Sequence, residues 1–485
     1  MRARKALIAL VALVAGFLAH ERFTFDHDAW LADYDQLRGH VSRNYANLLW
    51  VMEHRDLDPV ALHQATLRAL GEAHTDRAAR AAIGSFLGAF QDGHLRINRT
   101  PLSRRLETLF TSEADALPAN TTPEKACAAL GFHDDTDGLT FASPDLAPLN
   151  TPDNSFAAAT FRLGDQPAGM VRISIFDTKR YLGACHRAWQ SQIGARQCDA
   201  SCVEAFVNAS VPNQLLAEFS TQVRELDRAG AKMLVVDITG NGGGTDWVEP
   251  AARIVTQKSL SCAPVAFIKG PHWTKAFSEV AEKIEKDIGA GFMPDVPLLQ
   301  LAHGRALELR DRADDICALD SVWTTQRPPT CSNLVEDAAY SACGLMGPLP
   351  QGSASRATSR DALFHGLAYT YDEGIFGGKV AVLVDNGTAS AAEYFAAILA
   401  DNDSATILGQ LTYGVGCGYT NGGAGVTLSH SGLVIAMPDC QRRRKDGTNE
   451  MAGIAPDVVV DWKNGDSDAE RWAKLTRALA PLLAE

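Results

Sequence analysis

The sequence predicts an α/β fold preceded by a helical segment, and two patterns carry this prediction. From about residue 161 onward, short apolar runs typical of buried strands alternate with helical segments. Between Asp28 and Leu87, apolar residues instead recur at helical spacing with polar residues between them, which predicts two or three packed helices. A chain of 485 residues is long enough for a substantial core and two or three structural units.

The composition is that of a folded globular protein, and the charge excludes one large class of function. Hydrophobic residues make up 46% of the chain and charged residues 21%. Lys and Arg number 45 against 58 Asp and Glu, which gives a formal net charge of −13. Such an acidic balance repels phosphate backbones and anionic lipids, so no nucleic-acid partner is expected.

The first 19 residues have the pattern of a signal peptide. Basic residues precede an unbroken run of 14 apolar residues from Ala6 to Ala19. A membrane-spanning helix needs about 20 apolar residues, so a cleaved signal is favoured and an uncleaved anchor is the alternative. No later stretch is long and apolar enough to span a bilayer. We therefore expect an exported protein, periplasmic or secreted, with no membrane span after cleavage.

The chain contains an even number of cysteines, as expected of an exported protein with disulfides. They are Cys127, Cys185, Cys198, Cys202, Cys262, Cys317, Cys331, Cys343, Cys417 and Cys440. The three between residues 317 and 343 are consistent with a stapled loop insert, and a Cys417–Cys440 pair is a further guess. A zinc site at Cys185, His186, Cys198 and Cys202 is the minority alternative, because two tight ligand pairs are lacking. No metal and no cofactor are expected.

These patterns divide the chain into successive regions. The predicted regions are a signal peptide at 1–19, a helical domain at 20–99, a variable connecting region at 100–160, an α/β core at 161–465 with a cysteine-rich insert at 259–376, and a C-terminal helix at 466–485. The connecting region contains Ala129-Leu130-Gly131-Phe132, which is similar to a peptide-binding carboxylate loop but lacks flanking strands. No PDZ domain is predicted from it.

Two loops that follow predicted strands carry residues suited to catalysis. The strand at 232–237 runs into a loop with glycines at 240 and 242–244, and such a loop exposes backbone N–H groups that can bind an anion. The strand at 379–384 ends in a loop that places Ser390 at the start of an alanine-rich helix. There the N–H of Ala391 can donate to a developing oxyanion, although an N-cap is the simpler role for Ser390.

Taken together, four ordered motifs resemble those of the S41 serine peptidases, the C-terminal processing (tail-specific) proteases and their tricorn-core relatives. The motifs are Asp237–Gly244, Asn386–Glu393, Leu408–Gly416 and Gly453–Asp457. The resemblance covers roughly Asp28 to Trp462 and is densest in the second half. It implies a ClpP/crotonase-like β-β-α core with an N-terminal helical bundle.

The resemblance also implies roles for particular residues. The family nucleophile falls on Ser390, and the oxyanion donors fall on Gly242 or Gly243 and on Ala391. In the tail-specific branch a lysine activates the serine, and its position is Val415 here. The Ser-Lys dyad is therefore absent, and another base is required if the serine is to react.

The tricorn-like branch supplies that base as a histidine, which falls on His94, and a glutamate that falls on Glu450. The implied arrangement is Ser390, His94 and Glu450, with His94 as base and acid and the carboxylate as its orienting partner. One departure is Gly93, where that branch carries a serine that links the histidine to the glutamate. Either Glu450 then meets His94 directly or through water, or Asp92 orients the imidazole.

The leading hypothesis is thus an exported serine endopeptidase that cleaves protein or peptide substrates through an acyl-enzyme. A catalytically silent protein that binds a peptide or apolar ligand in the same cleft is the alternative. A crotonase-type thioester enzyme ranks last, because it explains neither Ser390 nor the export signal. We assign no role to Glu393 and expect the charge run 442–445 to be a solvated loop. The substrate sequence and the oligomeric state do not follow from the sequence.

Overall fold

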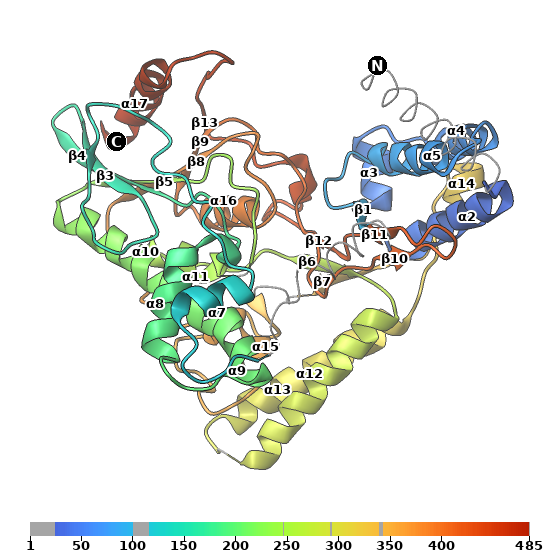
Figure 1. Ribbon diagram of the computed structural model, residues 1–485, viewed down its shortest axis with the longest axis horizontal. Coiled ribbons are helices and arrows are strands. Elements are labelled where there is room, and N and C mark those ends of the chain that lie inside the picture. The colour runs from blue at the N-terminus through green and yellow to red at the C-terminus, as the bar shows by residue number, and fades with distance from the viewer. Residues whose placement is uncertain (1–24, 100–115, 246, 292, 339–342, 485) are drawn as a thin grey trace, which may run out of the picture.

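The computed structural model describes residues 25–99, 116–245, 247–291, 293–338 and 343–484 (Figure 1). The predicted signal peptide at 1–19 lies outside the described residues. Among the helices of the described part, none is long and apolar enough to cross a membrane.

Helices make up much of the chain. They are α2 (His27–Asn44), α3 (Leu48–His54), α4 (Pro59–Gly71), α5 (Asp76–Gly88), α7 (Pro123–Ala129), α8 (Leu182–Gln192), α9 (Ala200–Ala205), α10 (Val211–Arg228), α11 (Val248–Ile254), α12 (Pro271–Ala290), α13 (Val296–Asp314), α14 (Val322–Thr325), α15 (Arg360–Leu363), α16 (Ala391–Asp401) and α17 (Asp468–Ala484). The helical spacing before residue 88 thus corresponds to four helices, α2 through α5, where two or three were predicted.

The strands are β1 (Arg96–Arg99), β2 (Ala147–Pro148), β3 (Ala158–Leu163), β4 (Gln166–Arg172), β5 (Met233–Asp237), β6 (Val265–Ile268), β7 (Leu334–Ala338), β8 (Lys379–Val384), β9 (Thr406–Gly409), β10 (Val426–Thr427), β11 (Val434–Ala436), β12 (Cys440–Arg442) and β13 (Val458–Val459). Seven of them form one sheet in the order β13-β9-β8-β5-β4-β3-β2. Its neighbours from β13 to β4 run parallel, and β3 and β2 add antiparallel strands at one edge. The predicted α/β fold is confirmed.

The central strands are apolar throughout because helices cover both faces of the sheet. Side chains of successive residues point to opposite faces, so Leu234 and Val236 pack with residues of α10, α11 and α16. Met233 and Val235 lie on the other face, where they share a core with Trp472 and other residues of α17. The C-terminal amphipathic helix therefore docks on the sheet (Figure 1).

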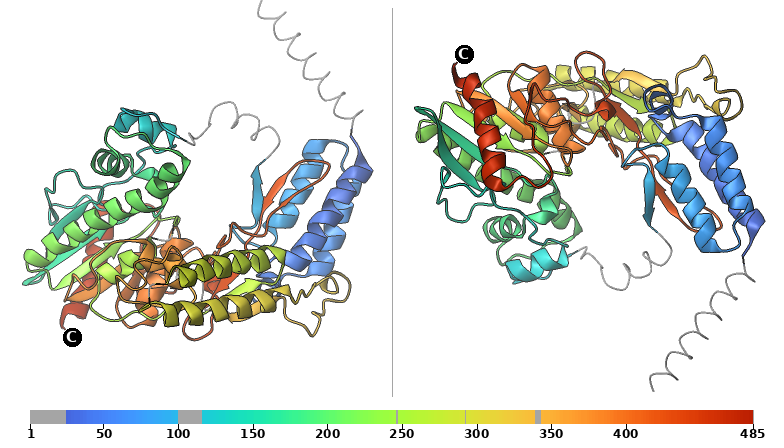
Figure 2. Two further views of the ribbon diagram at one scale, coloured as in Figure 1. Left: turned by 90° about the horizontal axis from the view of Figure 1, so that it is seen from below. Right: turned by 90° about the horizontal axis from the view of Figure 1, so that it is seen from above.

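The N-terminal helices lie at the other end of the molecule from this sheet (Figures 1 and 2). They share a core with Leu319 and Trp323 from the insert and with Leu428 and Ile435 from the β10–β11 region. Strand β1 pairs with β11, so the chain just after the helices joins a sheet formed from a segment more than 300 residues later. The helical domain is thus completed by residues distant in the sequence.

Much of the predicted insert at 259–376 is a helical hairpin. Helices α12 and α13 pack on the three-stranded sheet β12-β6-β7 through apolar residues such as Trp273, Phe277 and Leu309. Figure 2 shows this hairpin extending from the sheet domain toward the N-terminal helices. Cysteine and proline content predicted an elaborated insert but not these two long helices.

All ten cysteines are paired. The pairs are Cys127–Cys185, Cys198–Cys202, Cys262–Cys343, Cys317–Cys331 and Cys417–Cys440. The predicted disulfides are therefore confirmed, and Cys417–Cys440 is among them. The four residues of the zinc alternative do not form a metal site, because their three cysteines are consumed in disulfides.

The segment Ala129-Leu130-Gly131-Phe132 ends helix α7 and is not a peptide-binding loop. Gly131 adopts a φ of 78°, and the N–H of Phe132 donates to the carbonyl of Cys127. This is the hydrogen-bond pattern of a glycine C-cap, with Phe132 buried against α8.

Candidate active site

Ser390 lies between strand β8 and helix α16 in a backbone conformation that few residues adopt. Its φ is 58° and its ψ is −118°. A non-glycine residue in such a region costs free energy, of order 1–3 kcal/mol, and persists only where its surroundings hold it. Strain of this kind is concentrated at functional sites, so the conformation itself marks Ser390 as a candidate.

Hydrogen bonds hold the peptide groups on both sides of Ser390. Its N–H donates to Oε2 of Glu393 at 2.9 Å. Its carbonyl accepts from the N–H of Tyr394 at 3.1 Å and from Nη2 of Arg442 at 3.2 Å. The strained conformation is therefore fixed from the helix on one side and from strand β12 on the other.

The glycine loop after β5 contacts Ser390 closely. A Cβ added at Gly243 would lie 2.8 Å from the N of Ala391 and 2.8 Å from Cβ of Ser390, and the φ of Gly243 is 95°. Only glycine permits this approach. The N–H of Gly243 donates to Oδ1 of Asn241. Of the predicted oxyanion donors, Gly242 and Ala391 are therefore the two whose N–H groups no described residue takes up.

His94 lies in the turn before β1, and its ring is held by a backbone carbonyl. Nδ1 is 3.3 Å from the carbonyl oxygen of Val415. Since a carbonyl only accepts, this contact requires the proton on Nδ1 and leaves Nε2 as an acceptor. Burial lowers the pKa of His94, against the opposing charge of Asp92. A neutral imidazole with an accepting Nε2 is the form that a general base requires.

The backbone of Gly418 packs against the face of the His94 ring. A Cβ added at Gly418 would lie 2.9 Å from Nε2, 3.0 Å from Cε1 and 3.1 Å from Cδ2. The ring of Tyr419 meets the imidazole edge to face, with centroids 5.2 Å apart. The hydroxyl of Tyr419 also donates to the backbone carbonyl of His94.

The two departures from the family pattern, Gly93 and Val415, are in contact. A Cβ added at Gly93 would lie 2.9 Å from Cγ1 of Val415 and 3.3 Å from Cε1 of Tyr413. Val415 therefore occupies the space that a serine at position 93 would need.

Asp92 is buried below His94 and fixes its backbone. Oδ1 accepts from the N–H of His94 at 2.9 Å, and Oδ2 accepts from the hydroxyl of Tyr45 at 2.8 Å. Burial raises the pKa of Asp92, and the nearby His94 opposes this rise. Asp92 thus positions the turn, while the ring nitrogen is held by Val415.

Glu450 is fully buried but is paired with an arginine. Its Oε2 accepts from Nε of Arg442 at 2.6 Å. Its Oε1 has no hydrogen-bond partner among the described residues. Burial raises the pKa of Glu450, and the charge of Arg442 lowers it. The structure therefore connects Glu450 to Ser390 through Arg442 and records no hydrogen bond between Glu450 and His94.

Two residues of the site were not predicted. Glu393, to which no role was assigned, accepts from Ser390 and from the hydroxyl of Thr412 and the N–H of Val415, at 2.6 and 3.2 Å. It thereby joins the serine to the loop that holds His94. Its spacing of three residues from Ser390 is that of a capping box, a signal that the sequence contained.

Arg442 is the second residue, and it corrects the expectation of a solvated loop. Its side chain is buried, and it contacts Glu450 and the ring of Tyr394. Arg444 is also engaged, because its guanidinium donates to both carboxylate oxygens of Asp401. Arg442 ends the buried strand β12, and a run of charges in the sequence does not reveal that burial.

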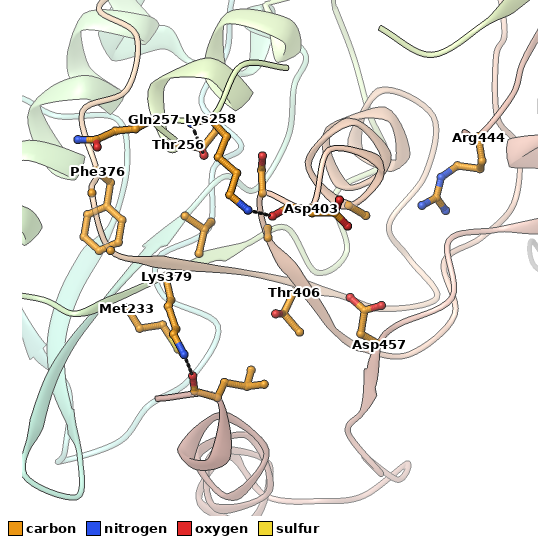
Figure 3. Close-up of a pocket in the computed structure, with 17 residues that line it drawn as sticks. Met233, Thr256, Gln257, Lys258, Phe376, Lys379, Asp403, Thr406, Arg444 and Asp457 are labelled. Atoms are coloured by element: carbon orange, nitrogen blue, oxygen red, sulfur yellow. Dashed lines mark hydrogen bonds between the residues drawn. The ribbon is translucent and has the colours of Figure 1, made fainter. Parts of the chain in front are cut away.

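A cavity of about 690 Å³ lies at the other end of the sheet (Figure 3). It is lined by Met233, Lys379 and Thr406, the first residues of three parallel strands, whereas Ser390 follows the last residue of β8. In Figure 3 the ammonium groups of Lys258 and Lys379 are bonded to backbone carbonyls. This cavity is therefore separate from the candidate active site.

The sequence matches a known family over the region that carries Ser390 and Glu450. Residues 336–460 match the model of peptidase family S41. This part of the chain is therefore similar to peptidase family S41, and it contains three of the four motifs that carry the predicted resemblance. A comparison with curated proteins finds no match.

Two solved structures of mature CPAF share the fold at low sequence identity. The structure of mature CPAF complexed with lactacystin has a TM-score of 0.58 at 13% identity, over 94% of this chain and 98% of that chain. A second structure of mature CPAF has a TM-score of 0.57 at 12% identity, over 94% and 97% of the two chains. The photosystem II D1 C-terminal processing protease has a TM-score of 0.36 at 15% identity, over 94% and 97%. The likeness to CPAF shows the fold alone, and the family match over residues 336–460 favours a peptidase.

Proposed function

We propose that this chain is an exported serine endopeptidase that hydrolyses peptide bonds through an acyl-enzyme on Ser390. The observation that carries the proposal is the series of hydrogen bonds that connects Ser390 to His94. Glu393 accepts from the N–H groups of both Ser390 and Val415, and the carbonyl of Val415 holds Nδ1 of His94. A strained serine at a helix N-terminus and a neutral histidine are thus tied to one buried carboxylate.

In the proposed reaction, Nε2 of His94 takes the proton of the Ser390 hydroxyl as Oγ bonds to the scissile carbonyl carbon. The N–H groups of Ala391 and Gly242 donate to the oxyanion that forms. The carbon–nitrogen bond breaks as His94 returns the proton to the leaving amine. Water, activated by the same imidazole, then hydrolyses the ester and restores Ser390.

The proposed base differs from the lysine of the tail-specific branch. Val415 contributes its carbonyl, which selects the Nδ1–H tautomer of His94 and so takes the part usually played by a carboxylate. Glu450 was predicted to orient His94. It remains a candidate for this role, because its Oε1 is buried and has no hydrogen-bond partner among the described residues.

Export is supported by the five disulfides together with the basic and apolar N-terminal run. Structural disulfides persist in oxidising compartments, so the periplasm or the extracellular space is the proposed location.

The direct test is hydrolysis of an unfolded protein such as casein by the purified, oxidised protein. Wild type is expected to cleave it, and Ser390→Ala and His94→Ala are each expected to lower kcat by about 10³-fold or more. Unchanged folding of the variants, measured by circular dichroism, is the control. Equal cleavage by wild type and Ser390→Ala would exclude Ser390 as the nucleophile.

A catalytically silent binding protein is the second candidate, and Val415 in place of the lysine is the observation that favours it. It predicts that a peptide from a random library binds wild type and Ser390→Ala with equal affinity and is recovered uncut from both. Cleavage by wild type alone would exclude it.

A further inference from the structure

We propose that Arg442 is a positioning residue of this peptidase, which orients the oxyanion donor by holding the carbonyl of Ser390. The inference rests on the proposed function, because it assigns a part in that reaction to a residue outside the three predicted catalytic ones. It also gives the buried carboxylate of Glu450 a role that acts through Arg442.

The contact is made to one particular peptide group. Nη2 of Arg442 donates to the carbonyl oxygen of Ser390, and that carbonyl belongs to the same planar peptide unit as the N–H of Ala391. Fixing the carbonyl therefore fixes the direction of the N–H, which points the opposite way. A cation on the carbonyl also withdraws electron density from the amide and makes its N–H a stronger donor.

The surroundings hold the guanidinium in place on three sides. Nε donates to Oε2 of Glu450 at 2.6 Å, and the guanidinium carbon lies 4.6 Å from the centre of the Tyr394 ring. Arg442 is 9% exposed and Glu450 is 0% exposed. Removing both charges from water is costly, and this cost is compensated only where the pair is hydrogen-bonded, as it is here. These contacts therefore hold Arg442 in a fixed position against the carbonyl of Ser390.

Tyr394 connects the Arg442–Glu450 ion pair to a second buried ion pair. Its hydroxyl donates to Glu249, whose other oxygen accepts from Arg253 at 2.6 Å. Glu450 and Arg442 thus stand at the Ser390 end of a buried chain of charged and aromatic groups. Such a network has little freedom to move, which suits a group that must hold a strained backbone.

Arg444 provides a matched control. It lies two residues further along the chain, and its guanidinium is bonded to Asp401 at the end of helix α16. Arginines therefore contact both ends of helix α16, but of the two only Arg442 contacts Ser390. A role in holding the helix is common to both arginines, whereas a role in orienting the oxyanion donor is special to Arg442.

The test compares Arg442→Lys, Arg442→Gln and Arg444→Lys with wild type, in casein hydrolysis and in the rate of labelling by a fluorophosphonate probe. We expect Arg442→Gln to lower kcat and the labelling rate by about 10²-fold, the effect of losing one oxyanion donor, with KM changed by less than about 3-fold. Lysine can make one of the two hydrogen bonds, so Arg442→Lys should restore part of the rate. Arg444→Lys should leave kcat unchanged.

Glu450→Gln separates the two roles open to that carboxylate. If Glu450 acts through Arg442, the variant lowers kcat and leaves the acid limb of the kcat/KM profile, which reports His94, in place. The double variant Arg442→Gln/Glu450→Gln should then be no slower than Arg442→Gln alone. If Glu450 instead orients His94, the acid limb moves and the two effects multiply.

Each remaining outcome overturns the inference. Folded Arg442→Lys and Arg442→Gln variants with kcat within about 3-fold of wild type would exclude an orienting role. An equal loss of kcat in Arg444→Lys would mean that Arg442 only stabilises helix α16 and does not orient the oxyanion donor. If Arg442→Gln does not fold, the rate of Arg442→Lys decides. A wild type that neither hydrolyses nor labels overturns the proposed function, and the inference falls with it.

Discussion

At the scale of the residue, the chemistry of the site depends on how His94 is held. The sequence singled out Ser390 through one of the four ordered motifs and His94 through the resemblance to the tricorn-like branch. It could not show that Val415, the residue that replaces the family lysine, would hold the imidazole through its backbone carbonyl, since any residue at that position offers a carbonyl. Glu450 was assigned from family order, whereas its partner depends on the burial of Arg442.

The pH dependence of the activity reports on this environment. His94 must be neutral to accept the proton, and burial lowers its pKa from the ordinary value of 6.5. A lowered pKa keeps the imidazole neutral at lower pH, so the acid limb of kcat/KM is expected below pH 6.5. Steady-state hydrolysis between pH 4 and 9 measures it. An acid limb above the ordinary pKa would mean that a charge, and not burial, dominates at His94.

At the scale of the element, the site depends on the meeting of two loops at the carboxyl ends of β5 and β8. These strands pair in parallel, so the loops that follow them meet at one edge. Apolar runs predicted both strands and their loops, because buried parallel strands have a simple signature. The hairpin of α12 and α13 was not predicted, since it lies in a region that cysteine and proline content marked only as an insert.

The glycines of the first loop allow a matched comparison. Gly243→Ala places a Cβ 2.8 Å from three atoms of the Ser390 loop and requires a φ of 95°. It should cost about 1–3 kcal/mol of stability and most of the activity. A Cβ at Gly242 meets no protein atom within 4 Å, so Gly242→Ala should keep the stability of wild type. Thermal unfolding and casein hydrolysis measure the pair, and equal behaviour would refute the predicted close approach.

At the scale of the whole molecule, the site is assembled from distant parts of the chain. His94 follows the N-terminal helices, Ser390 follows β8, and Arg442 ends a strand that pairs with β6. The N-terminal helices, for their part, share a core with residues near 320 and 430. Periodicity located the N-terminal helices and strands β5 and β8, but the long-range pairings depend on side-chain packing that no local pattern contains.

The disulfides differ in what they hold together. Cys417–Cys440 links the loop that contacts His94 to the strand that ends in Arg442, whereas Cys198–Cys202 closes a separation of only 4 residues. The double variant Cys417→Ala/Cys440→Ala should lower stability by about 2–4 kcal/mol and lower kcat. Cys198→Ala/Cys202→Ala should lose less stability and keep kcat. Equal kcat in both double variants would show that the first disulfide does not organise the site.

The central claim, an activated Ser390 with His94 as its base, is tested most directly by fluorophosphonate labelling of the signal-free, oxidised protein, followed by intact mass. The account predicts one covalent adduct on wild type and none on Ser390→Ala or on His94→Ala. Wild-type protein that is folded and oxidised yet forms no adduct would contradict it, as would an adduct that persists in Ser390→Ala.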